Sequence, residues 1–110
     1  MNKLQELQND IHQWADKTFG KERETISAAY HLKKEINELI ESLESDRLDT
    51  DTPEEFADCF ILILNTASKY GMTTHDLIRK SKWKMSKNKL RQWGKPDENG
   101  VVEHIRTEAS

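Results

Sequence analysis

The chain has 110 residues, of which 35% are hydrophobic and 34% charged, and its formal net charge is −3. This length suits one domain and excludes an enzyme with a separate cofactor-binding half. The low apolar share predicts a small core that is shared with other subunits. The single cysteine, Cys59, excludes an internal disulfide and a cysteine-rich zinc site. Because neither a signal peptide nor a long apolar run is visible, we expect a soluble, cytoplasmic protein without a membrane partner.

The predicted helices follow one another closely, because only two prolines and four glycines interrupt the chain. The first helix spans about residues 3–17 and carries one apolar stripe, in which we expect Trp14 to be a core residue. The second helix spans about residues 24–46, and a polar loop over residues 45–51 follows it. Its apolar stripe consists of Ala29, Leu32, Ile36, Leu39, Ile40 and Leu43.

The third predicted helix has the clearest start signal in the chain. Thr52 is a candidate cap, Pro53 suits the first helical turn, and Glu55 follows Thr52 by three residues, as in a capping box. Gly71 supplies the stop. Because this helix is apolar nearly all round, we expect it at the centre of a bundle or in a subunit interface.

The fourth predicted helix begins near residue 73 and ends near Trp93, with Asp76 in its first turn, where the helix dipole favours an acid. No stretch alternates in the manner of a strand. We therefore predict an all-α fold, a four-helix bundle whose core is shared in a homodimer or homotetramer. The predicted organisation is a helical domain over residues 1–94 and a C-terminal arm or loose tail over residues 95–110.

Two pairs of carboxylates lie within an acidic block, residues 35–58, which contains ten acidic residues and one basic residue. Glu35 and Glu38 belong to the second helix, and Glu55 and Asp58 belong to the third. The i, i+3 spacing of each pair places both carboxylates on one helix face. Glu35 and Glu38 flank the apolar stripe, so they can face a cleft beside the core.

Asp58 lies in the most apolar segment of the chain, where an unpaired buried carboxylate is costly. If the two helices face each other, their four carboxylates repel, and a divalent cation relieves that repulsion. Oxygen ligands without histidine or cysteine favour Mg²⁺, for which Mn²⁺ can substitute. A surface location of each pair, a capping function of Glu55 and a lysine partner for Asp58 are the alternatives. Two pairs on consecutive helices favour the metal site.

A basic block follows on the fourth helix, where residues 79–91 contain seven basic residues and no acidic residue. Lys84, Asn88 and Arg91 recur at i, i+4 and i+7, and this row of donors suits a chain of phosphates. The alternatives are a solvated face and a nucleic-acid-binding helix with stacking tryptophans, which the acidic overall balance disfavours. We expect the isolated histidines at the surface or at edges: His12, His31, His75 and His104.

The order of these motifs resembles the all-α nucleoside triphosphate pyrophosphohydrolases, the MazG-like superfamily that also includes the dimeric dUTPases. Their mark is Glu-x-x-Glu on one helix and Glu-x-x-Asp on the next, which bind Mg²⁺. The matching residues here are Glu35, Glu38, Glu55 and Asp58. A later Lys-x-x-x-Asn-x-x-Lys/Arg element of short MazG-like proteins is similar to Lys84, Asn88 and Arg91. Residues 93–104 look like the MazZ-like branch of phage and bacteria, which is associated with dATP/dGTP pyrophosphohydrolase activity.

The resemblance implies that the chain hydrolyses a nucleoside triphosphate to the monophosphate and pyrophosphate. The four carboxylates would hold Mg²⁺, and either Glu35 or Glu38 would act as the general base. The phosphate-binding residues would be Lys84, Asn88 and Arg91. A dUTPase and a hydrolase of modified nucleotides compete with dATP/dGTP specificity. Outside the enzymes, a nucleic-acid-binding helical regulator and a helical adaptor remain as alternatives.

Overall fold

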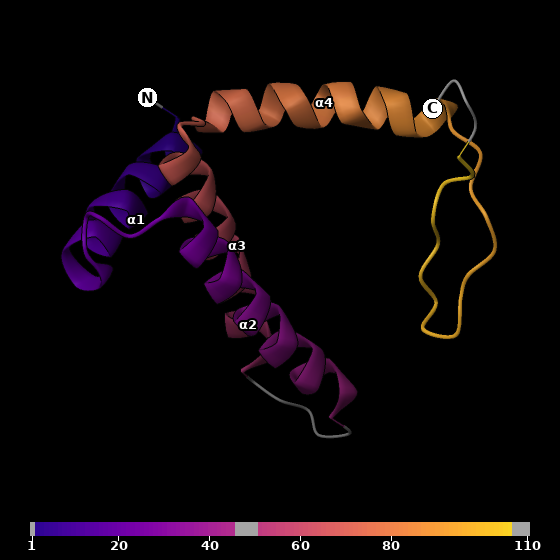
Figure 1. Ribbon diagram of the computed structural model, residues 1–110, viewed down its shortest axis with the longest axis horizontal. Coiled ribbons are helices and arrows are strands. Elements are labelled where there is room, and N and C mark those ends of the chain that lie inside the picture. Colours follow the sequence, from indigo (N-terminus) through magenta and orange to yellow (C-terminus); the bar gives the residue numbers. More distant parts are fainter. Residues whose placement is uncertain (1, 46–50, 107–110) are drawn as a thin grey trace. The chain divides into compact units, whose positions relative to one another are not determined.

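A computed structural model describes residues 2–45 and 51–106, and these residues form the predicted all-α fold, with helices and no strand (Figure 1). The helices are α1 (Lys3–Phe19), α2 (Thr25–Glu44), α3 (Thr52–Tyr70) and α4 (Thr74–Leu90). The predicted helices lie within a few residues of these bounds, and most of the predicted loop after α2 lies outside the described residues. Among the described residues, no helix is both long and apolar enough to cross a membrane.

The contacts group the chain into two compact units, Met1–Leu77 and Ile78–Ser110, and each is described by itself. In the first unit α3 packs against both α1 and α2, so it is the central helix, as its apolar sequence predicts. All three helices contribute to the small core, whose buried apolar side chains are Ile11, Ala15, Ala28, Cys59, Leu62 and Leu64. The small size of this core agrees with the low apolar share of the composition.

Polar side chains of α1 fix this helix to the C-terminal end of α3. Gln8 is only 2% exposed, and its Nε2 donates hydrogen bonds to the carbonyl oxygens of Leu64 and Met72, each at 3.1 Å. Gln5 Oε1 accepts hydrogen bonds from Thr74 N and Thr74 Oγ1, both at 2.9 Å. Because buried polar groups must be paired, these bonds specify how α1 lies against α3.

The start of α3 differs from the prediction, because Thr52 lies inside the helix, one residue after the N-cap residue Asp51. The Thr52 hydroxyl forms a hydrogen bond with the Ser42 hydroxyl at 2.5 Å, which joins the end of α2 to the start of α3. A reciprocal capping pattern occurs instead at α4. There Thr73 N donates to Asp76 Oδ2 at 3.0 Å, and Asp76 N donates to Thr73 Oγ1 at 3.1 Å.

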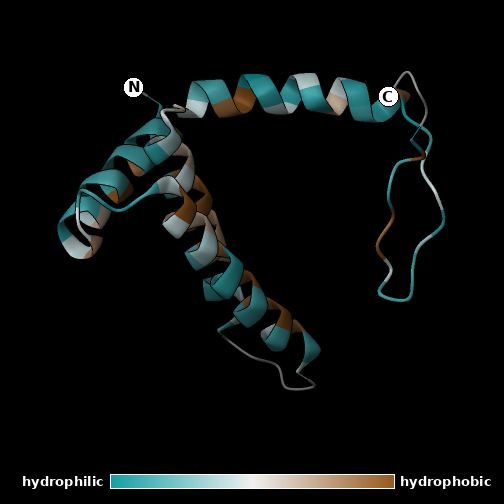
Figure 2. Ribbon diagram, in the orientation of Figure 1, coloured by the Kyte–Doolittle hydropathy of each residue, from teal (hydrophilic) through white to brown (hydrophobic). Residues whose placement is uncertain are grey.

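Half of the apolar stripe predicted for the second helix is exposed in the single chain, and the other half is half-buried. All residues of α2 are described, and only Ala28 among them is buried. Figure 2 shows hydrophobic colours along α3, whereas α4 is mainly hydrophilic. The large apolar side chains of α2 and α3 with 39% exposure or more include Ile36, Ile40, Leu43, Phe56, Phe60 and Ile63. One chain therefore leaves apolar surface on both helices in contact with solvent.

The second unit contains most of α4 and a C-terminal hairpin, which we define as residues 92–106. Trp93 and His104 form an isolated antiparallel bridge, and Ile105 N donates to Gln92 O at 2.7 Å. The Asp97 carboxylate accepts two backbone N–H groups of the turn, at 2.8 and 2.9 Å. The chain after α4 is thus folded back on itself within the described residues. The proposed division at residue 94 stays a prediction.

Candidate functional site

Carboxylates of α2 and α3 meet where these two helices pack side by side (Figure 1). Glu35 on α2 and Glu55 and Asp58 on α3 each offer one oxygen, and the three oxygens lie within 4.8 Å of one another. The i, i+3 spacing of Glu55 and Asp58 places both side chains on one face of α3, and this face meets Glu35 of α2. The structure therefore brings together three of the four residues that the sequence indicates as metal ligands. Glu38, the fourth, is exposed and is not part of this set.

The pKa of Glu35 is strongly raised by its surroundings in the acidic cluster. Burial raises the pKa of Glu35 from its usual 4.5 to about 7, and a hydrogen bond and the charge of Glu38 contribute, followed by the charges of Asp58 and Glu55. The Glu35 side chain is only 16% exposed. Asp58, by contrast, is exposed, so the prediction that it is buried is wrong. Asp58 lines a cavity that opens to solvent instead of lying in the packed core.

His31 connects the acidic cluster to Arg23. Arg23 Nη2 lies 2.9 Å from His31 Nδ1, and His31 Nε2 lies 3.6 Å from Glu35 Oε1. Because a guanidinium group only donates hydrogen bonds, Nδ1 is the acceptor and the ring proton of neutral His31 resides on Nε2, facing Glu35. Burial lowers the pKa of His31, and the charges of Arg23 and Lys34 lower it further. The sequence grouped His31 with isolated histidines, although its i, i+4 spacing from Glu35 was a signal for this contact.

A cavity of about 570 Å³ adjoins the carboxylates within the first unit. Trp14 and Phe19 line it with an edge-to-face contact of 5.2 Å between ring centroids, and Phe19 meets the His31 ring at 5.5 Å. The guanidinium group of Arg23 lies 4.7 Å from the centroid of Phe19. Trp14 is 53% exposed, so its assignment to the core is wrong. The cavity combines an aromatic wall with carboxylates, which suits a ligand with a flat ring and a cation-binding group.

The basic residues that the sequence assigns to phosphate binding lie in the second unit. Arg91 Nη1 donates a hydrogen bond to Asn88 Oδ1 at 3.2 Å. The charge of Arg91 is the main cause that lowers the pKa of Lys84, so these two cations lie close together. Lys84 and Asn88 of α4 and Arg91, which follows the last helical residue, therefore form one group, and their function stays a prediction.

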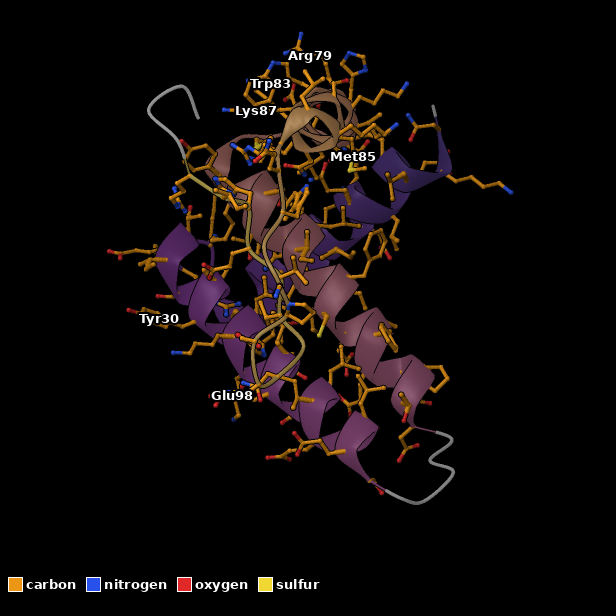
Figure 3. The ribbon with its side chains drawn as sticks, turned by 90° about the vertical axis from the view of Figure 1, so that its right-hand side faces the viewer. Tyr30, Arg79, Trp83, Met85, Lys87 and Glu98 are labelled. Atoms are coloured by element: carbon orange, nitrogen blue, oxygen red, sulfur yellow. The ribbon has the colours of Figure 1, made fainter. Side chains whose placement is uncertain are left out.

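Trp83 belongs to a different face of α4. Figure 3 shows Arg79, Trp83 and Lys87 on one side of this helix and Met85 on the other. The ammonium nitrogens of Lys80 and Lys87 each lie 5.4 Å from the centroid of the Trp83 ring. These cation–π contacts would compete with a stacked base. This geometry does not favour the nucleic-acid-binding alternative.

Comparisons with known proteins agree with this geometry. Residues 7–110 match the dATP/dGTP pyrophosphohydrolase family. Among solved structures, the chain is similar to a MazG-like pyrophosphohydrolase of cyanophage S-2L, bound to dGDP and three catalytic Mn²⁺ ions per active site. The two chains are 32% identical, the similarity covers 97% of each, and the TM-score is 0.72. No curated protein matches the sequence. The predicted resemblance and the MazG-like all-α fold are thereby confirmed.

Proposed function

Since the chain belongs to the dATP/dGTP pyrophosphohydrolase family, it is a nucleoside triphosphate pyrophosphohydrolase, and we propose that dATP and dGTP are its substrates. Each would be hydrolysed to the deoxynucleoside monophosphate and pyrophosphate. The observation that carries this proposal is the convergence of Glu35, Glu55 and Asp58 beside a cavity with an aromatic wall. A nucleoside triphosphate has a flat base, which suits the aromatic wall, and a chain of anionic phosphates, which suits a cation held by the carboxylates. Its binding therefore requires both features in one site.

The donor set fits a hard divalent cation, because every group in it is a carboxylate oxygen. We assign Mg²⁺ as the cation, with Mn²⁺ as a substitute, and the cyanophage protein contains Mn²⁺ ions. A bound cation supplies Lewis-acid charge that neutralises phosphate oxygens. The proposed ligands are Glu35, Glu38, Glu55 and Asp58. Glu38 reaches the set through its neighbour Glu35, with which it shares a hydrogen bond.

Two groups of side chains would carry out the reaction. Glu38 would be both a ligand and the general base, because its exposed carboxylate borders the three-oxygen set and can accept a proton from the water that attacks the α-phosphorus. Glu35 is the alternative base. The positive charges of Lys84 and Arg91 would stabilise the leaving pyrophosphate, and Asn88 would orient an oxygen of the phosphates or the sugar.

The cavity would hold the nucleoside part of the substrate. A base can stack on Trp14, whose ring is 53% exposed and lines the cavity together with Phe19. The carboxylate of Asp10 lines the same cavity. A carboxylate accepts hydrogen bonds from the amino groups that adenine and guanine carry and that uracil lacks. This chemistry favours dATP and dGTP over the dUTPase alternative.

A second copy of the chain is the proposed partner of the apolar surface on α2 and α3. The core within one chain is small, and large side chains such as Leu43 and Phe56 are 59% and 54% exposed. Burial of such side chains between subunits is a main driving force of association. We expect a homodimer or homotetramer, which light scattering after size-exclusion chromatography would measure.

The function is tested by supplying Mg²⁺ and a panel of triphosphates that includes dATP, dGTP, dCTP, dUTP and modified nucleotides. We expect pyrophosphate release from dATP and dGTP, and its loss in Asp58→Ala and Glu38→Ala. Glu41→Ala removes an exposed carboxylate from the same helix as Glu38 and should keep the activity. Orthophosphate as the sole product, or full activity in both Asp58→Ala and Glu38→Ala, would overturn the proposal.

A further inference from the structure

The C-terminal hairpin holds two further basic residues beside the end of α4. His104 pairs with Trp93 in the antiparallel bridge, and their rings form an edge-to-face contact with centroids 5.9 Å apart. The bond from Ile105 N to Gln92 O at 2.7 Å extends this pairing by one residue. Arg106 follows directly. Backbone hydrogen bonds thus connect the segment that contains His104 and Arg106 to the segment directly after α4.

His104 interacts electrostatically with Lys84 of α4 and with Arg91, and Arg106 interacts with Lys84, as the pKa values of Lys84 and His104 show. The pKa of Lys84 is lowered first by Arg91, then by burial, and also by Arg106. The pKa of His104 is lowered first by burial, then by Arg91, Arg106 and Lys84, and Glu103 partly offsets this. In the part of the chain that the structure describes, Lys84, Arg91 and Arg106 make no ion pair. Positive charge is therefore concentrated here, and among the described residues Glu103 offsets only part of it at His104.

Two atoms of this cluster are buried and lack a hydrogen-bond partner among the described residues, Arg91 Nε and His104 Nε2. Arg91 is held in place by its bond to Asn88 Oδ1, so its Nε has a defined position. A buried polar atom without a partner is destabilising, and a ligand that supplies an acceptor relieves that cost. The cluster thus suits an anion with several acceptor oxygens.

We propose that His104 and Arg106 complete, with Lys84 and Arg91, a site that holds the pyrophosphate portion of the nucleotide. This inference rests on the proposed function, which assigns the phosphates to α4. The cluster draws its charges from α4, from Arg91 directly after it, and from the C-terminal hairpin, which fold together. A convergent group of charges suits a compact anion such as pyrophosphate, whereas a nucleic-acid backbone is matched by a row of cations along a surface.

The direct test is calorimetric titration of the full-length protein with inorganic pyrophosphate. We expect Arg106→Ala to weaken pyrophosphate binding about tenfold, the loss typical of a hydrogen bond between charged groups. Arg106→Lys should retain part of the affinity, because it keeps the charge and loses the planar fork. Lys95→Ala is the matched control. Lys95 is an exposed cation of the same hairpin, and it is not among the groups that shift the pKa of Lys84 or of His104. In the enzyme assay, Arg106→Ala should raise the KM for dATP by a similar factor.

An unchanged pyrophosphate affinity in Arg106→Ala, or an equal loss in Lys95→Ala, would overturn this inference. Weaker binding of a DNA duplex by Arg106→Ala, with pyrophosphate affinity unchanged, would overturn it in favour of a nucleic-acid ligand. The proposed function fails on a different result, namely no pyrophosphate release from dATP or dGTP by the unmodified protein. The pyrophosphate titration does not depend on that activity, so the two failures are distinguishable.

Discussion

A rise in pH from about 5 to about 8 is expected to destabilise the metal-free protein, and Glu35 is the responsible group. Burial first, and then Glu38, Asp58 and Glu55, raise the pKa of Glu35 from 4.5 to about 7. In the unfolded chain this carboxyl group ionises near 4.5. Between these two values the folded protein keeps a proton that the unfolded chain has released. The stabilisation by this proton is complete below about pH 4.5 and is lost as the pH rises through about 7.

The size of the effect follows from the shift in pKa. A change from 4.5 to about 7 corresponds to about 3 kcal/mol of unfolding free energy. The Glu35 side chain is 16% exposed, so solvent screening reduces this figure only in part. Urea denaturation in a chelating buffer, at a fixed protein concentration, measures the free energy at both pH values. Glu35→Gln should remove most of the difference, whereas Glu41→Gln, an exposed position on the same helix, should keep it.

A divalent cation should reverse the destabilisation at the higher pH. Cation binding to the folded protein alone stabilises it by about 2.7 kcal/mol when the cation is present at a hundred times its Kd. Mn²⁺ should therefore raise the unfolding free energy of the unmodified protein and have a smaller effect on Glu35→Gln. The same pH dependence in Glu35→Gln and in the unmodified protein would refute the reasoning, because it would assign the proton to another group.

Three further predictions concern catalysis, substrate binding and the core. Glu38→Gln should lower kcat at least about a hundredfold, the loss expected for a general base, and a kcat equal to that of the unmodified enzyme would exclude that function. Trp14→Ala should raise the KM for dATP about tenfold by removing a stacking surface, while Trp83→Ala should leave the KM unchanged; steady-state rates test both. Leu64→Ala, at a side chain only 2% exposed, should cost about 2–5 kcal/mol in urea denaturation. Leu90→Ala, at a position 89% exposed, should change the unfolding free energy by less than about 0.5 kcal/mol, and equal losses at both positions would contradict the burial argument.

The positions of the helices and the acidic and basic faces that they present follow from the amino-acid pattern alone. Both depend on residues three or four positions apart, which the helical repeat places on one face in any context. For this reason the sequence alone predicts that Glu35 and Glu38 share one face of the second helix and that Glu55 and Asp58 share one face of the third. The charge blocks on these helices also predicted separate sites for a cation and for phosphates.

Which of these groups come into contact depends on how the helices pack. Whether Trp14 belongs to the core or to a cavity wall depends on how α1 lies against α3, and the buried amide of Gln8 specifies that arrangement. His31 joins the site because Arg23 and Glu35 approach it from either end of its ring. Arg106 acts electrostatically on Lys84 because the C-terminal hairpin pairs Trp93 with His104, eleven positions later in the sequence. The contacts of α1 with α3 and those of the hairpin join residues far apart in the chain, and local periodicity carries no information about such distances. The contact between His31 and Glu35, by contrast, follows from their i, i+4 spacing.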